Sequence, residues 1–183
     1  ASAKSRSHGK VSFSAKGEAG LDLNFTEPDR ARFLSFSASA DLRPTGKLRV
    51  SGSYNHVRRN REGDGSRFSI QQIPRLKVEY QVSRPIFLRV VGQYSVDQLS
   101  PLRDPATGLP LLQRNSSGRY VLTAARSVND LRLDWLFSYR PNPGTVVFFG
   151  YGSSLAEANA FEFSSVRRVR DGFFIKLSYL FRV

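Results

Sequence analysis

The sequence contains no cysteine, only two histidines and no long apolar run. Without cysteine, neither a disulfide framework nor a thiolate metal site can form. The longest apolar stretch, 146–151, is far shorter than the roughly 20 residues that a membrane-spanning helix needs. The first ten residues are polar and basic without an apolar centre, so they predict no signal peptide. An exported protein would therefore have this chain as its mature form or as a piece of a longer chain.

Size and composition leave several classes of protein open. A chain of 183 residues predicts one domain. Its mean hydropathy of −0.35 is that of a soluble protein. Transmembrane β-barrels have similar values, because half of each strand faces a polar lumen. The formal net charge of +13 favours an anionic partner: nucleic acid, an anionic membrane or an acidic substrate. No known nucleic-acid-binding fold or aromatic interleaving is recognisable, so no nucleic-acid partner is predicted.

A short motif returns along the chain. Residues 48–54 read Leu-Arg-Val-Ser-Gly-Ser-Tyr, residues 88–94 read Leu-Arg-Val-Val-Gly-Gln-Tyr, and a weaker copy covers 146–151. In an extended strand the Leu, Val, Gly and Tyr of this motif lie on one face and the Arg on the other. Each copy follows an Arg-Pro turn, at 43–44, 84–85 and 140–141. Strands with one apolar and one charged face are typical of β-barrels in lipid.

Alternation of apolar and polar residues predicts eight strands. It is unbroken over 11–25, longer than the usual 5–6 residues of a soluble strand and long enough for a barrel wall, which takes about 9–11. Pro74 predicts a bulge or an edge in its strand. The predicted strands are 11–25, 34–42, 48–57, 68–82, 86–96, 131–139, 145–152 and 171–182. Tight turns at 43–47, 83–85 and 140–144 alternate with long polar loops at 57–66, 98–118 and 155–170.

These observations predict an all-β fold: an antiparallel transmembrane β-barrel of about eight strands, or an arc of a larger barrel. Residues 1–10 are interpreted as a polar N-terminal tail and 11–183 as the barrel domain. Aromatic residues are predicted in two belts, one near the long loops and one near the short turns. The first consists of Tyr54, Phe68 and Tyr94, and the second of Tyr80, Tyr139, Tyr179 and Phe181. Acidic residues in and beside the long loops, such as Glu157, are interpreted as solvated charges.

The last strand resembles the C-terminal assembly signal of bacterial outer-membrane proteins, in which alternate apolar residues end in Tyr-x-Phe. The signal residues would be Phe173, Ile175, Leu177, Tyr179 and Phe181. Segments 133–152 and 171–182 also resemble the C-terminal end of a family of large uncharacterised bacterial outer-membrane proteins. In that family a periplasmic module, similar to family 9 carbohydrate-binding domains, precedes a C-terminal barrel. The resemblance implies a barrel fragment or a shortened relative, with that N-terminal module missing from these residues.

Candidate chemistry is sparse. His56 has Ser53 and Asn55 nearby in sequence, but neighbours in a strand point to opposite faces, so no Ser–His catalytic pair is predicted. No catalytic residue, metal site or cofactor is predicted. Two arginine groups in the long loops are predicted to contact lipopolysaccharide phosphates, because guanidinium groups bind phosphate with two hydrogen bonds. These residues are Arg58, Arg59, Arg61, Arg167, Arg168 and Arg170.

The polar faces of the strands predict a charge network in the lumen, with serines of the early strands opposite long side chains of the middle ones. Its members are Lys16, Glu18, Asp22, Asp41, Arg49, Arg75, Lys77, Glu79, Arg89, Arg132, Asp134 and Lys176. The predicted function is a structural, anchoring or transport barrel, porin-like and without catalysis, in the outer membrane of Gram-negative bacteria. Its expected partners are outer-membrane lipid, lipopolysaccharide and the barrel-assembly machinery. The alternatives are an outer-membrane lipid-modifying enzyme and a soluble β-barrel that binds an acidic ligand.

Overall fold

The computed structural model describes residues 2–4 and 10–180, and all of their regular structure is β-strand. No helix among them is long and apolar enough to cross a membrane. The eight predicted strands are all present, and three short strands add to them. In chain order the strands are β1 (Ser2–Lys4), β2 (Val11–Asn24), β3 (Asp29–Leu42), β4 (Leu48–Arg61), β5 (Arg67–Gln81), β6 (Ile86–Leu99), β7 (Leu112–Arg114), β8 (Tyr120–Leu122), β9 (Arg126–Tyr139), β10 (Thr145–Glu157) and β11 (Arg167–Tyr179).

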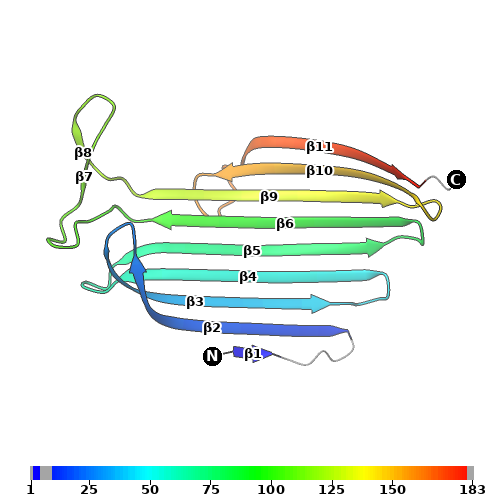
Figure 1. Cartoon of the computed structure of the whole chain (residues 1–183), viewed down its shortest axis with the longest axis horizontal. Helices are drawn as coiled ribbons and strands as arrows, with labels where there is room; N and C mark the ends of the chain where they lie inside the picture. The colour runs from blue at the N-terminus through cyan, green and yellow to red at the C-terminus, as the bar shows by residue number, and fades with distance from the viewer. Residues whose placement is uncertain (1, 5–9, 181–183) are drawn as a thin grey trace.

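The long strands form one antiparallel sheet in chain order, β1-β2-β3-β4-β5-β6-β9-β10-β11. The short turns lie at one end of the sheet and the long loops at the other, as predicted (Figure 1). The loop between β6 and β9 carries its own small hairpin, β7–β8. Strand β1, within the predicted N-terminal tail, pairs with residues 14–16 of β2.

The sheet is open. Strand β11 pairs only with β10, and no described residue of β11 contacts β1 or β2 at the opposite edge. The structure therefore shows an eight-stranded antiparallel wall with a short ninth strand, and it does not show a closed eight-stranded barrel. An edge strand with free N–H and C=O groups is a template for pairing with a further strand.

Several strands are longer than predicted. Strand β4 continues to Arg61, β9 begins at Arg126, and β11 begins at Arg167, so the predicted loop arginines 58–61 and 167–170 are strand residues. The prediction placed them in loops because these strand ends carry polar residues on both faces and so lack the apolar alternation. Strand pairing alone extends them.

Pro74 lies neither at an edge nor in a bulge, contrary to the prediction. It is in β5, a central strand, opposite Tyr54 of β4. The pairing of β5 with β6 stops at Gln72 and resumes at Arg75 in the same register. The missing N–H of proline therefore interrupts the hydrogen-bond ladder locally without shifting it.

The fold has almost no interior. Only four hydrophobic residues of the described chain are buried: Ala31, Phe68, Tyr94 and Val96. The accessible surface is 13090 Å², whereas a compact soluble protein of 20.5 kDa exposes about 8,900 Å². A single sheet of this kind buries neither of its faces by itself, so the folded state requires something else to cover the apolar one.

Candidate functional site: a two-faced sheet with tied loops

One face of the sheet is apolar across all eight long strands. Directly opposed residues in antiparallel strands share a face, so the register traces each row of side chains across the sheet. One such row is Val11, Leu42, Val50, Val78, Val90, Trp135, Tyr151 and Phe173. Many large apolar side chains of this face are exposed, among them Leu21, Leu76, Ile175 and Leu177.

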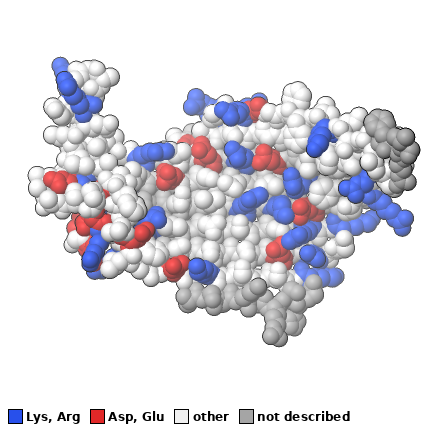
Figure 2. Space-filling view, viewed as in Figure 1, with Lys and Arg blue, Asp and Glu red and all other residues white. Residues whose placement is uncertain are grey.

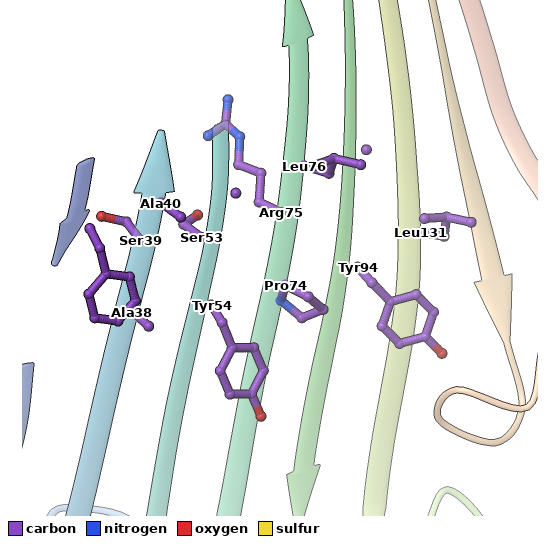
Figure 3. Close-up of a pocket in the computed structure, with 13 residues that line it drawn as sticks. Ala38, Ser39, Ala40, Ser53, Tyr54, Pro74, Arg75, Leu76, Tyr94 and Leu131 are labelled. Atoms are coloured by element: carbon purple, nitrogen blue, oxygen red, sulfur yellow. The ribbon is translucent and has the colours of Figure 1, made fainter. Parts of the chain in front are cut away.

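The middle of the apolar face is hollowed. A shallow depression of about 490 Å³ lies where small residues such as Ala38, Ala40 and Gly52 replace large ones. The rings of Tyr54, in β4, and Tyr94, in β6, lie at its border (Figure 3). Most residues that line the depression, such as Phe13, Leu76 and Leu131, belong to the apolar face, so the depression is part of that surface.

The sheet is staggered. The row that starts at Val11, the first residue of β2, reaches Phe173, and β11 continues six residues further to Tyr179 (179 − 173 = 6). The row through Glu157, the last residue of β10, reaches Gly17 of β2, seven residues before Asn24 (24 − 17 = 7). Each strand is thus shifted by about one residue along its length relative to its neighbour. As a result, the line that joins the strand ends at either end of the sheet makes an angle of about 30–40° with a row of directly opposed residues.

The opposite face is charged. The register places every residue of the predicted lumen network on this one face. Figure 2 views the face over which acidic and basic side chains are spread, with Lys and Arg more numerous toward the short-turn end. The structure pairs some of these charges: Lys16 with Glu18 at 3.1 Å, Arg49 with Asp41 at 2.8 Å, Arg59 with Asp22 at 3.4 Å and Lys77 with Glu79 at 3.0 Å.

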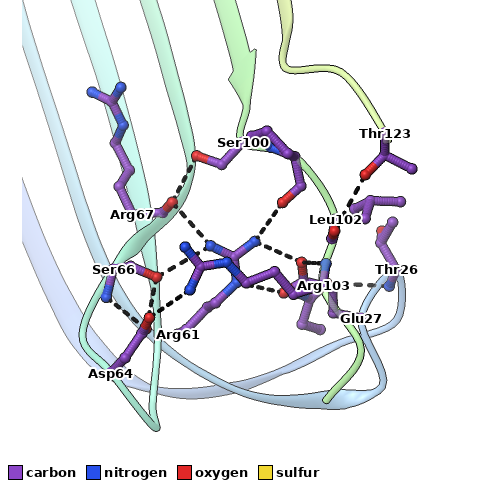
Figure 4. Close-up of polar contacts among 12 residues, drawn as sticks. Thr26, Glu27, Arg61, Asp64, Ser66, Arg67, Ser100, Leu102, Arg103 and Thr123 are labelled. Carbon is purple, nitrogen blue, oxygen red and sulfur yellow. Dashed lines mark hydrogen bonds and ion pairs between the residues drawn. The ribbon is translucent and has the colours of Figure 1, made fainter. Parts of the chain in front are cut away.

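At the long-loop end, a buried ion pair ties three connections together. The guanidinium of Arg61 donates two hydrogen bonds to Glu27, of 2.6 and 2.7 Å, and the two side chains are only 11% and 4% exposed. The backbone N–H of Arg103 also donates to Glu27, and Arg61 donates to the backbone oxygen of Pro101 (Figure 4). The segments 25–28, 62–66 and 100–104 are thereby held against one another.

Asp64 extends this network at the surface. It accepts hydrogen bonds from the hydroxyl and the backbone N–H of Ser66, and it forms a 2.6 Å ion pair with Arg103. These contacts, the Ser66 hydroxyl first, lower the pKa of Asp64 to about 2. Because the folded pKa lies below the usual 3.8, this stabilisation is present above about pH 4 and is lost as the pH falls through about 2.

A second cluster covers one end of the apolar face. Tyr94 and the backbone N–H of Phe163 both donate hydrogen bonds to Glu157, and Phe161 stacks on the Tyr94 ring at 4.7 Å. Phe161 and Phe163 have positive φ angles of 64° and 54°, a conformation that this packing holds in place. The loop after β10 therefore folds over Tyr94.

Two sequence-based interpretations fail here. Glu157 is buried and hydrogen-bonded, whereas it was interpreted as a solvated charge. Tyr94 and Phe68 are buried too, so they do not form an exposed aromatic belt at the long-loop end. Alternation assigns a residue to a face, but it carries no information about loops that fold back over that face.

The predicted arginine groups are divided between the two faces. Arg59 and Arg61 lie on the charged face and already bind acidic partners, while Arg58 lies on the apolar face and donates to Asn60. Strand β11, far from β4 in the sheet, carries the other group: Arg168 is opposite Leu155, and Arg170 is opposite Ser154. The structure therefore does not assemble these six residues into one site.

His56 has local partners only. Its Nδ1 atom lies 3.4 Å from the Tyr54 hydroxyl and 3.3 Å from Nε2 of Gln72, on the apolar face. Ser53 and Asn55 belong to the charged face, as the alternation predicted. The described residues contain no group of three or more His, Cys, Asp or Glu side chains that could hold a metal ion.

Four of the five predicted assembly-signal residues are in β11. Phe173, Ile175, Leu177 and Tyr179 all lie on the apolar face at the free edge, and all are more than half exposed. Phe181 lies outside the described residues. Between these positions the ring of Phe174, on the other face, lies over Gly150, where any Cβ would collide with it.

The chain matches no family model, no curated protein and no solved structure.

Proposed function

We propose that this chain forms the wall of an outer-membrane β-barrel with a structural, anchoring or transport role. The observation that carries the proposal is the apolar face that runs unbroken across all eight long strands, opposite a charged one. A membrane-embedded wall needs this division, because lipid contacts one side and a polar lumen the other. The open edges would pair with each other or with further strands, as in an arc of a larger barrel.

The stagger supports the same proposal. Strands in transmembrane barrels are tilted by about 35–45°, so the band of lipid-facing residues crosses them obliquely. The apolar residues of this face reach Leu23 near the end of β2, whereas on β11 the paired positions of the same face before Phe173 are Arg168 and Asp171. An offset of about one residue per strand is the shift that such a tilt requires.

The proposed family and location rest on the resemblance of the last strand and of 133–152. Outer-membrane lipid, lipopolysaccharide and the assembly machinery are accordingly the proposed partners. No specific contact in the described residues favours the lipid-modifying enzyme or the soluble barrel.

The only tryptophan gives a direct test of the proposal. Trp135 lies on the apolar face between Val90 and Tyr151. After refolding into phosphatidylcholine vesicles, Trp135 fluorescence should be quenched by lipids brominated on their acyl chains and protected from aqueous acrylamide. The control is the double substitution Trp135→Phe and Val91→Trp, which moves the indole to the charged face and should reverse both results. A chain that stays monodisperse without lipid or detergent, with Trp135 open to acrylamide, would instead favour the soluble alternative.

The apolar edge of β11 should also control assembly in cells. Replacing Ile175 and Tyr179 by Ala removes two apolar side chains from the proposed signal, and a several-fold drop in heat-modifiable outer-membrane protein is expected. The matched control is Ser178→Ala, the neighbour on the other face. Equal yields of assembled protein from both variants would count against the assembly signal.

A further inference from the structure

One row of the charged face contains only residues that can donate a hydrogen bond. We call it the arginine–serine row, and it takes one residue from each long strand. Its members are Ser14, Ser39, Ser53, Arg75, Gln93, Arg132, Ser154 and Arg170. No member is acidic, although the adjacent row toward the short turns contains Asp41 and Asp134.

The three arginines of this row have no ion pair or side-chain hydrogen bond with any described residue. Of the acids nearby, Asp41 pairs with Arg49 and Glu79 with Lys77, whereas Asp130 and Asp134, which flank Arg132 along β9, form no ion pair with any described residue. All three guanidinium side chains are also exposed. They therefore remain available to a ligand, which distinguishes them from Arg59 and Arg61.

The row passes through a groove of about 630 Å³. The groove is lined by all three arginines, and Lys77 and Arg89 add to its positive charge. Its single acidic residue, Asp134, lies against Gly152, where a Cβ would meet its carboxylate. The glycines at 152 and 172 leave part of the groove without side chains, so a ligand can approach the backbone there.

We infer that the arginine–serine row binds a dissolved anion that carries phosphate or carboxylate groups. Guanidinium groups bind such oxygens with paired hydrogen bonds, and serine hydroxyls and the Gln93 amide supply further donors. Lysine and arginine rings in barrel pores select anions in the same way. A lipid headgroup is a poorer occupant, because the row is on the face opposite the apolar one. This inference deepens the proposed function: in a membrane wall, the row would face the lumen and favour anions.

Calorimetric titration of the full chain in an uncharged detergent tests the inference, with inorganic phosphate and tripolyphosphate as probes. The row variant replaces Arg75, Arg132 and Arg170 by Gln. The control replaces the turn arginines Arg43, Arg84 and Arg140 by Gln and so removes the same net charge. We expect the affinity for tripolyphosphate to fall about tenfold or more in the row variant. In the control variant the affinity should change by less than about twofold. The single variant Arg132→Gln, which removes one exposed and unpaired side chain, should give an intermediate affinity.

Equal weakening by both triple variants, or no binding by the unmodified chain, would overturn the inference. Short-chain phosphatidylglycerol is the second ligand: if it binds with the same dependence on the row, the site belongs to lipid headgroups and the dissolved-anion inference is wrong. Quenching of Trp135 by brominated lipid, measured on the same purified chain after refolding into vesicles, separates the two proposals. Quenching without anion binding contradicts only the inference that the arginine–serine row binds an anion. Anion binding without quenching contradicts only the proposal that the chain forms a membrane wall.

Discussion

Val90→Arg should prevent stable membrane assembly, whereas the same substitution one residue later should be tolerated far better. Val90 is 51% exposed on the apolar face and lies between Val78 and Trp135, in the middle of the apolar residues of β6. An arginine facing lipid at this depth costs about 2–4 kcal/mol. Cold gel electrophoresis after refolding into vesicles should then show little heat-modifiable protein, and urea unfolding should show the loss of stability.

Val91 is a close control for this substitution. It is the same residue type in the same strand, but it belongs to the charged face, between Lys77 and Asp134. An arginine there would face Asp134, which forms no ion pair with any described residue, while it would also meet the repulsion of Lys77. Equal losses at positions 90 and 91 would contradict the assignment of the two faces.

The sequence was sufficient to predict the strands and their faces. A period of two is a local property, so residues such as Leu131, Leu133 and Trp135 assign their own face without reference to any partner. The short turns further restrict the register, since Pro44 and Gly144, with its φ of 98°, fix where each hairpin reverses. Sequential antiparallel pairing then follows from these tight connections.

Closure of the sheet could not be predicted in the same way. Whether β2 meets β11 depends on curvature and on the offset accumulated over all the strands, and no local pattern records either quantity. The alternation on β11, from Phe173 to Tyr179, is the same whether its free edge meets β2 or a further strand. Both alternatives were therefore open from the sequence, and the structure shows an open edge.

The ion pairs also depend on register. Asp41 and Arg49 lie eight residues apart across a hairpin, and their pairing follows from the turn between them. By contrast, the residues directly opposite Arg132 on the two neighbouring strands are Gln93 and Ser154, neither of which is acidic. Listing charges along a strand cannot separate these two cases.

The loop network was missed for a further reason. Glu27 and Arg61 are 34 residues apart, and the loop that covers them begins only at Ser100. Each looks like an ordinary surface charge in its own segment. Three separate connections must fold together before either side chain loses contact with water.

This network leads to a second large expected effect, at Glu27. Glu27→Gln leaves the guanidinium of Arg61 buried without its counter-charge, and removing one partner of a buried pair typically costs about 3–5 kcal/mol. The free energy of unfolding of the vesicle-inserted chain should fall by that amount, as measured by urea titration of Trp135 fluorescence. Glu62→Gln, at the same end of the sheet but without an ion pair to any described residue, should change it by less than about 0.5 kcal/mol.

The double substitution Glu27→Gln and Arg61→Gln separates a buried charge from a lost contact. If the cost of the single variant comes from the uncompensated guanidinium, removing that charge as well should restore part of the stability, because neutral side chains are less costly to bury. Limited trypsin digestion should report the same order, since cleavage after Arg103 requires the loop to leave Glu27. The opposite outcome is a double variant whose free energy of unfolding lies well below that of Glu27→Gln. It would show that Arg61 stabilises the loops mainly through Ser66, Pro101 and Phe68 rather than through Glu27.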